Sequence, residues 1–206
     1  DVWSLFAAWV PYMLSARAEV VVALDWTDFD ADDQATLALH MMTSHGRATP
    51  LMWKTVRKSE LGGNRNRVED DLLIHLRSVV LKDVKVTVVA DRGFGDAELY
   101  ALMWELGFDY VIRFRAVIRV TDAKGETKPA GEWVPETGRP KMLRDALVTG
   151  RKNPIPAVVC VKAKGMKDAW CLATSLEEKT AAEVVKLYGR RFTIEESFRD
   201  AKDSRF

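Results

Sequence analysis

Four polar residues near the end of the chain are spaced so that they would lie along one side of a helix, where they could bind metal ions and phosphate groups. They are Tyr188, Arg191, Glu195 and Lys202. An α-helix turns by roughly 100° per residue, so relative to Tyr188 the other three lie near about −60°, −20° and −40°. One aromatic hydroxyl, two cations and one carboxylate therefore share a narrow stripe of the expected helix. Such a stripe suits a site for metal ions and phosphate groups.

An apolar stripe lies about 60–80° further round the same helix, which we expect to span residues 181–203. It would anchor the helix by one edge and leave the polar stripe accessible. The alternative is an ordinary solvated helix face. Glu196 is a rival to Glu195, but it falls off the polar stripe. The apolar stripe consists of Leu187, Ile194, Phe198 and Ala201.

Two more carboxylates stand at the ends of expected strands. Asp25 closes the β-branched run of residues 19–26, and Asp91 follows the run of residues 84–90 and begins the turn Asp-Arg-Gly-Phe-Gly. A strand-terminal Asp can be a simple turn residue, and Asp28 is a rival to Asp25. Side chains alternate along a strand, so Asp28 would point to the opposite face.

Asp25, Asp91 and Glu195 together would give a set of hard oxygen ligands. Mg²⁺ and Mn²⁺ prefer such ligands and keep several waters. Two ions about 3.5–4 Å apart can activate an attacking oxygen and stabilise a leaving one in phosphoryl transfer. We therefore expect a site for two divalent ions, Mg²⁺ or Mn²⁺.

The motif resembles that of the bacterial insertion-sequence-four transposases, a family of DDE cut-and-paste enzymes. Tyr, two residues, Arg, three residues, Glu, six residues and Lys match the family's closing helix, from Tyr188 to Lys202. Asp25 with Thr27, and Asp91-Arg-Gly-Phe, resemble its first and second catalytic aspartates. The resemblance covers nearly the whole chain from about Glu19.

The resemblance implies an α/β fold with an RNase H-like mixed sheet flanked by helices and a β-rich insertion before the last catalytic helix. Residues 121–174 are rich in Gly and Pro and contain short apolar runs, which read as antiparallel strands. We expect three parts: residues 1–120 as the first part of the core, 121–175 as the insertion, and 176–206 as the closing helix.

The resemblance also implies a role for each matched residue. The catalytic residues and metal ligands would be Asp25, Asp91 and Glu195, and the DNA-binding residues would be Tyr188, Arg191, Lys202 and Trp170.

Among the DNA-binding residues, Trp170 would stack on a flipped base, and the other three would contact phosphates. Trp133 is a weaker candidate for stacking, and a core tryptophan is the alternative for Trp170. The implied activity is metal-dependent cleavage and strand transfer at transposon ends through a hairpin intermediate. The partners would be double-stranded DNA, as transposon ends and target, and a second copy in a synaptic homodimer. Two alternatives stay open: an RNase H-like nuclease without strand transfer, and a domesticated, inactive DNA-binding protein.

Charge is unevenly distributed along the 206 residues. Residues 1–110 carry 11 Lys/Arg against 17 Asp/Glu, whereas residues 111–170 carry 13 against 6. A basic middle segment suggests contact with a polyanion; a solvated surface is the alternative. The two cysteines read as reduced core residues. No apolar run reaches the roughly 18 residues of a membrane span. We expect a fragment of a longer protein that acts on DNA in the bacterial cytoplasm, at the nucleoid.

Overall fold

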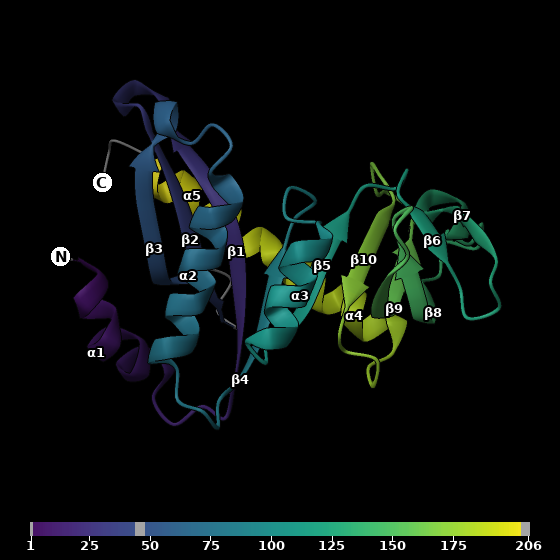
Figure 1. Ribbon diagram of the computed structural model, residues 1–206, viewed down its shortest axis with the longest axis horizontal. Helices are drawn as coiled ribbons and strands as arrows, with labels where there is room; N and C mark the ends of the chain where they lie inside the picture. Colours follow the sequence, from purple (N-terminus) through teal and green to yellow (C-terminus); the bar gives the residue numbers. More distant parts are fainter. Residues whose placement is uncertain (1, 44–47, 203–206) are drawn as a thin grey trace. The chain divides into compact units, whose positions relative to one another are not determined.

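The computed structural model describes residues 2–43 and 48–202, and the chain divides into two compact units. Unit 1 comprises residues 1–88, 106–108 and 191–206, and unit 2 comprises residues 89–105 and 109–190. Each unit has its own strands and helices, which are labelled in Figure 1.

Unit 1 is a strand meander with helices packed on it. Strand β1 pairs antiparallel with β2, and β2 pairs antiparallel with β3. The strand order is β3-β2-β1-β4. The elements are α1 (Val2–Leu14), β1 (Glu19–Phe29), the 3-10 turn η1 (Asp30–Asp32), β2 (Gln34–Met42), β3 (Ala48–Arg57), the 3-10 turn η2 (Lys58–Glu60), α2 (Arg65–Val79), the first residues of β4 (Lys85–Ala90), and α5 (Thr193–Lys202).

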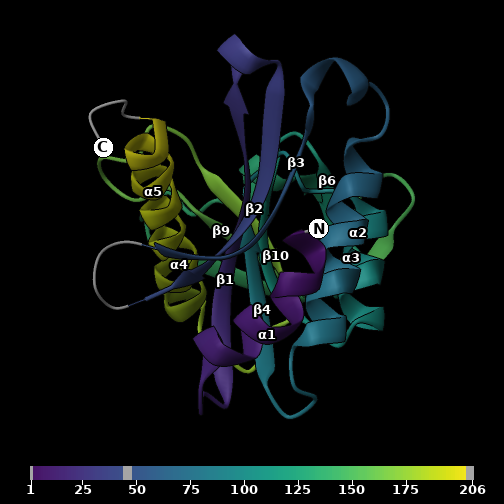
Figure 2. The same ribbon diagram turned by 90° about the vertical axis from the view of Figure 1, so that its left-hand side faces the viewer.

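Helices cover both faces of the β1–β3 meander. Figure 2 shows α1 and α2 together on one side of these strands and α5 on the other. Helix α5 contacts all three strands, while α1 and α2 contact each other and β3. In α1 the buried side chains are Phe6, Val10 and Leu14, which recur every four residues and so lie on one helix face. Burial of such apolar stripes is what attaches the helices to the sheet.

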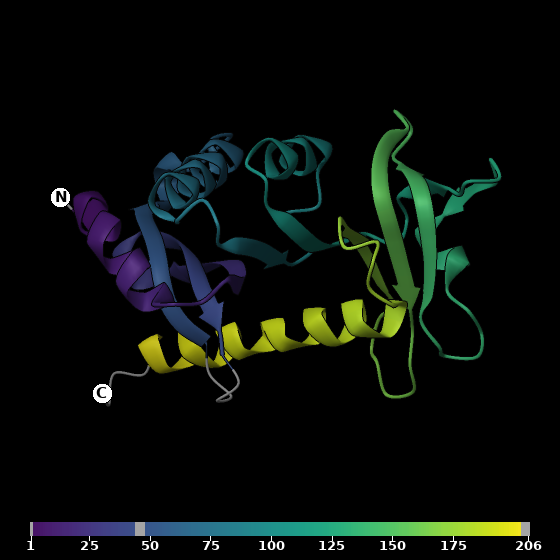
Figure 3. The same ribbon diagram turned by 90° about the horizontal axis from the view of Figure 1, so that it is seen from below.

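Unit 2 is built on a second run of strands in the order β5-β10-β9-β8-β6-β7. Strand β10 pairs antiparallel with both β5 and β9. Helices α3 and α4 both contact β5 and lie on its two sides (Figure 3). The elements are α3 (Ala97–Glu105), β5 (Asp109–Phe114), β6 (Arg119–Thr121), β7 (Thr127–Pro129), the 3-10 turn η3 (Ala130–Trp133), β8 (Lys141–Val148), β9 (Asn153–Val161), β10 (Trp170–Thr174) and α4 (Ala181–Gly189).

The expected α/β class, with sheet strands flanked by helices, is confirmed. Strands also occupy much of the segment 121–175, although its status as an insertion and the three expected parts stay predictions. Strand β1 runs three residues further than Trp26, to Phe29. The reason is hairpin pairing: Thr27, Asp28 and Phe29 lie opposite residues of β2, which outweighs the low strand propensity of Asp.

The expected continuous closing helix is wrong. The helix α4 ends at Gly189, a 3-10 turn η4 (Arg190–Phe192) follows, and α5 begins at Thr193. Glycine has a low helix propensity, and 3-10 turns are frequent at helix ends. The angular positions calculated for one unbroken α-helix therefore do not hold across this turn. In the described part of the chain, no helix is both long and apolar enough to cross a membrane.

Candidate functional site

Two of the expected catalytic carboxylates meet in unit 1 through one arginine. Nη1 of Arg191 donates a 2.8 Å hydrogen bond to Oδ2 of Asp25, and Nη2 of the same guanidinium donates a 2.9 Å bond to Oε1 of Glu195. Because one planar guanidinium reaches both acids, their carboxylate oxygens lie within the span of a single side-chain head group. Asp25 and Glu195 therefore converge on one cationic centre.

The local strand and helix geometry explains this meeting. Asp25 lies on β1, and its Oδ1 accepts a 2.9 Å bond from the backbone N–H of Trp26. Glu195 lies in the first turn of α5, where a negative charge is favoured by the helix dipole. Ile194 is fully buried and anchors this turn of the helix. Further along α5, the Oγ of Ser197 donates to the backbone carbonyl of Ala48 at the start of β3.

Burial of the three charged groups is graded. The exposed fraction of the side chain is 6% for Arg191, 18% for Asp25 and 50% for Glu195. A charge removed from water must be paired, and two carboxylates provide that pairing for Arg191. Arg191, Asp25 and Glu195 together carry a formal charge of −1. Solvent reaches this net negative charge at Glu195, which is the most exposed of the three.

The rival acids lie elsewhere in unit 1. Asp28 forms an ion pair of 3.0 Å with Lys58, and Glu196 pairs at 2.9 Å with Arg199 on the exposed side of α5. Neither contacts Arg191 in the described part of the chain. The alternation of β1 thus separates Asp25 from Asp28 as predicted, and the geometry favours Glu195 over Glu196.

The face of β1 opposite to Asp25 has an anchor that the sequence did not reveal. Nε1 of Trp26 donates a 2.7 Å hydrogen bond to Oε1 of Glu69, a carboxylate on α2 that is 4% exposed. The guanidinium of Arg65 lies over the Trp26 ring at 4.8 Å. These contacts fix the strand residue next to Asp25. In the sequence, this contact was indicated by nothing more than an acidic residue, Glu69, within the stretch that forms α2.

Asp91 begins a tight turn in unit 2, directly after β4. Its Oδ1 accepts a 2.7 Å hydrogen bond from the backbone N–H of Gly93. A Cβ on Gly93 would lie 3.0 Å from that oxygen, and a Cβ on Gly95 would lie 2.9 Å from the Cβ of Phe114. Both glycines therefore allow close approach, the first to the Asp91 carboxylate and the second to β5. Asp96 then caps α3, as its Oδ1 accepts a 2.8 Å bond from the backbone N–H of Leu99.

The two expected stacking tryptophans differ in their surroundings within unit 2. Trp170 is partly exposed at the start of β10, and its ring meets the Tyr188 ring edge to face at 4.8 Å. Trp133 is only 4% exposed; its Nε1 donates to the carbonyl of Val120, and Lys128 covers its ring at 4.0 Å. The weaker candidate Trp133 is therefore a core residue, as its bonded and covered ring cannot stack on a base.

The four residues of the polar stripe do not share one exposed face. Tyr188 is fully buried and Arg191 is 5% exposed, whereas Glu195 and Lys202 are exposed. Tyr188 lies in α4, Arg191 lies in the turn η4, and Glu195 and Lys202 lie in α5, so the four residues do not follow one helical path. Lys202 lies with its Nζ 5.5 Å from the ring of Phe29, at the end of β1. Helix α5 thus runs beside β1 from Asp25 to Phe29.

The basic middle of the sequence is largely exposed in unit 2. Of its 13 Lys and Arg residues, 11 have exposed side chains. They lie on strands and turns from β5 to the β9–β10 connection. The exposed set is Arg115, Arg119, Lys124, Arg139, Lys141, Arg144, Arg151, Lys152, Lys162, Lys164 and Lys167.

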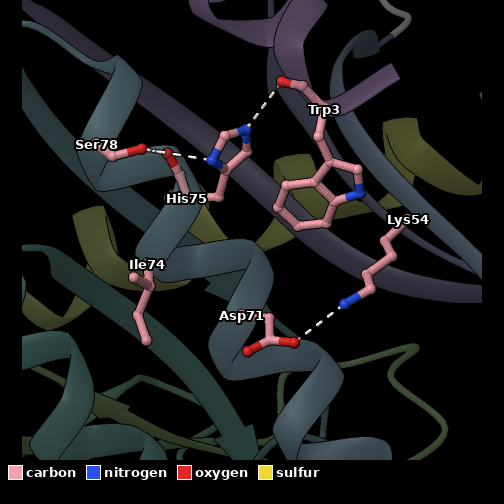
Figure 4. A pocket seen from close by; sticks show the side chains of 6 residues that line it. All are labelled: Trp3, Lys54, Asp71, Ile74, His75 and Ser78. Carbon is pink, nitrogen blue, oxygen red and sulfur yellow. Dashed lines mark hydrogen bonds and ion pairs between the residues drawn. The ribbon is translucent and has the colours of Figure 1, made fainter. Parts of the chain in front are cut away.

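Unit 1 also has an open pocket of about 410 Å³ between α1, β3 and α2 (Figure 4). Its polar groups bind one another: Lys54 pairs with Asp71 at 3.0 Å, and Nε2 of His75 contacts the backbone oxygen of Trp3. Lys54 is in register with Leu37 and Trp26, so it lies on the sheet face opposite to Asp25. The pocket is thus separate from the carboxylate pair.

Within the described ranges, no group of three or more His, Cys, Asp or Glu side chains could hold a metal ion. The structure describes a converging pair of carboxylates in unit 1 and, separately, the Asp91 turn in unit 2.

Comparison with known proteins gives the family. The model of the transposase DDE domain matches residues 16–206, and the chain belongs to this family. A curated relative, the chloroplastic palmitoyl-acyl carrier protein thioesterase of Cuphea hookeriana, is 24% identical over 151 residues, which cover 71% of this chain and 35% of that protein. The chain therefore spans about a third of the length of this relative.

A solved structure, Marinitoga piezophila Argonaute in complex with a 5′ OH guide RNA, is similar over 85% of this chain and 26% of the Argonaute chain. The sequence identity is 8% and the TM-score is 0.32, too low to support a conclusion about fold or function. The family match therefore carries the assignment to an enzyme that acts on nucleic acid.

Proposed function

We propose that this chain is the catalytic core of a DDE transposase of the insertion-sequence-four kind. It would cleave DNA at transposon ends and transfer the freed strand to target DNA, with a hairpin as intermediate. The observation that carries the proposal is the convergence of Asp25 and Glu195 on Arg191, with 2.8 Å and 2.9 Å bonds. The family's defining chemistry needs acids from distant parts of the chain, and the fold brings two of the expected three together.

The donor set fits a hard divalent cation. Asp25 and Glu195 offer carboxylate oxygens, which Mg²⁺ and Mn²⁺ prefer, and these oxygens already share one cationic group. In the proposal Asp91 is the third carboxylate ligand of the same ions. When bound, two such ions would activate the attacking oxygen and stabilise the leaving one.

The remaining polar residues would bind and orient DNA. Lys202 and the exposed basic residues of unit 2 would contact phosphates, the lysines as point charges and the arginines through two parallel N–H groups. Such contacts make DNA binding sensitive to salt. We propose that Arg191 also reaches a phosphate once DNA and metal are bound, since its guanidinium lies between the catalytic acids. Tyr188 is buried against Trp170. A phosphate contact by Tyr188 thus requires its exposure, whereas its present packing supports the ring of Trp170.

Two displacements at phosphorus would follow at one site. Water attacks the phosphate at the transposon end and breaks the P–O3′ bond, which leaves a free 3′-OH. That hydroxyl then attacks a phosphodiester of the opposite strand, and the new P–O bond closes the hairpin as the P–O3′ bond to the flanking DNA breaks and releases that DNA with a free 3′-OH. Trp170 would hold the extruded base, because stacking on an aromatic ring contributes about 1–3 kcal/mol per base. A second copy of the chain would be needed to bring two transposon ends together.

The test is cleavage of a duplex that carries the element's terminal sequence, in Mg²⁺ or Mn²⁺, by the full-length protein. Asp25→Asn, Asp91→Asn and Glu195→Gln should each lower the rate about 100-fold or more, since even outer-shell partners of a metal are worth about 10–100-fold. Asp28→Asn and Glu196→Gln are matched controls, because each removes a neighbouring carboxylate that lies outside the pair.

The products separate the proposal from its alternatives. A hairpin on a denaturing gel supports transposition chemistry, and nicked product without a hairpin or strand transfer supports a plain nuclease. Binding without cleavage in either metal supports an inactive DNA-binding protein. Full activity in Asp25→Asn, Asp91→Asn or Glu195→Gln would overturn the assignment of that residue.

A further inference from the structure

Arg191 is a buried cation placed between two acids that are expected to bind metal. Its side chain is 6% exposed, and its two terminal nitrogens bind Asp25 and Glu195 separately. A surface arginine that only awaited DNA would not need this burial. The guanidinium instead occupies the position from which a cation neutralises both carboxylates.

We propose that Arg191 is a positioning residue that holds Asp25 and Glu195 together before metal binds, and that it competes with the metal for them. The inference rests on the proposed function, which makes these two acids metal ligands. It adds a feature of regulation: the metal-free site carries its own internal cation, and loading the site requires that cation to give way.

Competition follows from the atoms involved. The guanidinium uses Oδ2 of Asp25 and Oε1 of Glu195, which are oxygens that a divalent ion would also use. A guanidinium left in place would add a positive charge beside the ion, and like charges at such short range repel strongly in a poorly solvated site. Without any cation, the two carboxylates would repel each other instead.

The position of Arg191 in the chain suits a side chain that changes partners. It lies in the 3-10 turn η4, between the end of α4 and the start of α5, and not within a regular helix. The ring of Phe192 lies 5.1 Å from its guanidinium, so part of its surroundings is an adjacent aromatic face. Glu195 is half exposed, which gives an ion from solvent access to one of the two carboxylates first.

The experiment measures metal binding without DNA and without turnover. Mn²⁺ is titrated into the full chain, and free Mn²⁺ is followed by electron paramagnetic resonance. Arg191→Gln should bind Mn²⁺ about tenfold more tightly than the parent chain, the change expected when one charge-assisted hydrogen bond no longer competes. The same variant should unfold at a lower temperature without metal, and Mn²⁺ should raise its melting temperature by more than it raises that of the parent.

Arg199→Gln is the matched control. It removes the same charge from α5, together with an ion pair to Glu196 that is exposed to solvent. It should leave Mn²⁺ affinity unchanged within about twofold, because exposed pairs are screened and weak. Arg191→Lys keeps the charge but loses the two-pronged geometry, and should bind Mn²⁺ with an affinity between those of the parent and Arg191→Gln.

Each outcome bears on the inference. Unchanged or weaker Mn²⁺ binding in Arg191→Gln overturns it, because a purely structural arginine would lower stability without raising affinity. If Arg191→Gln does not fold, the Mn²⁺ affinity of Arg191→Lys is the test, and unchanged or weaker binding than in the parent chain overturns the inference. Asp25→Asn separates the two proposals: if it binds Mn²⁺ as the parent does, the metal site itself is misplaced. If it loses binding while Arg191→Gln shows no gain, the site stands and the competition fails.

Discussion

Nη1 of Arg191 lies 2.8 Å from Oδ2 of Asp25, although the two residues are 166 positions apart in the chain. The contact joins strand β1 to the turn η4, directly before helix α5. Buried ion pairs add little net stability compared with apolar packing, but they are costly to break on one side. The ion pair between Arg191 and Asp25 is therefore better explained by a role in positioning the carboxylates than by a contribution to stability.

Loss of the Trp170 ring should reduce hairpin formation more than nicking. The ring is partly exposed and supported edge to face by Tyr188, so Trp170→Ala removes a stacking surface. We expect about a 5- to 100-fold decrease in hairpin product, the range that corresponds to about 1–3 kcal/mol of stacking. Trp104→Ala is a matched control, since that ring is 77% exposed on α3. Equal hairpin yield from both variants would contradict the stacking role.

Gly95→Ala should destabilise unit 2. Its Cβ would lie 2.9 Å from the Cβ of Phe114 and 3.0 Å from the carbonyl oxygen of Arg113, so the turn after Asp91 would have to move away from β5. Such overpacking costs about 1–3 kcal/mol in free energy of unfolding. Urea unfolding checks this. Gly150→Ala is the control, because nothing lies within 4 Å of the Cβ it would add. An equally stable Gly95→Ala would show that the turn yields easily.

His40 should make the protein less stable in acid. Burial against α5, where its ring meets Phe198 at 5.2 Å, lowers the pKa of His40 from 6.5 to about 4. The neutral form is therefore favoured in the fold. Its stabilising contribution is complete above the unfolded pKa of 6.5 and is lost as the pH falls toward 4.

The measurement is the free energy of unfolding in urea between pH 7 and pH 4. The histidine contributes on the order of 3 kcal/mol to its decline, as each pKa unit corresponds to about 1.4 kcal/mol. His40→Leu removes the titrating group and should flatten the decline over this range. An identical slope in the variant would assign acid sensitivity to other groups.

Thr180 should stabilise α4 in a manner that depends on pH. The Thr180 hydroxyl and backbone N–H both donate to Glu183, and the N–H of Glu183 donates back to Thr180 Oγ1. These bonds hold the pKa of Glu183 below its usual value, so the capping stabilises above the ordinary Glu range and is lost as the pH falls through the lowered pKa.

Thr180→Val keeps the size of the side chain and removes the hydroxyl of this capping box. Thermal unfolding should show a lower melting temperature than that of the parent at pH 7, and the difference should shrink as the pH is lowered below 4. Thr137→Val, at an exposed turn, is the control. A difference that is independent of pH would show that Glu183 does not share in the cap.

The sequence by itself indicated most of the local elements, and it predicted a preference for Asp25 and Glu195 over the neighbouring acids. Asp25 and Asp28 are three positions apart on β1, so they lie on opposite faces, because side chains of a strand alternate between its faces. The four-residue step places Glu195, and not Glu196, beside Arg191. All of these depend on interactions between residues that are close in the chain.

Only the tertiary structure decided which side chains became buried and paired. It placed Arg191 between Asp25 and Glu195, enclosed Trp133 beneath Lys128, and paired Trp26 with Glu69. The physical reason is common to them. Desolvation and long-range pairing depend on which elements pack together, and no local periodicity specifies the partner.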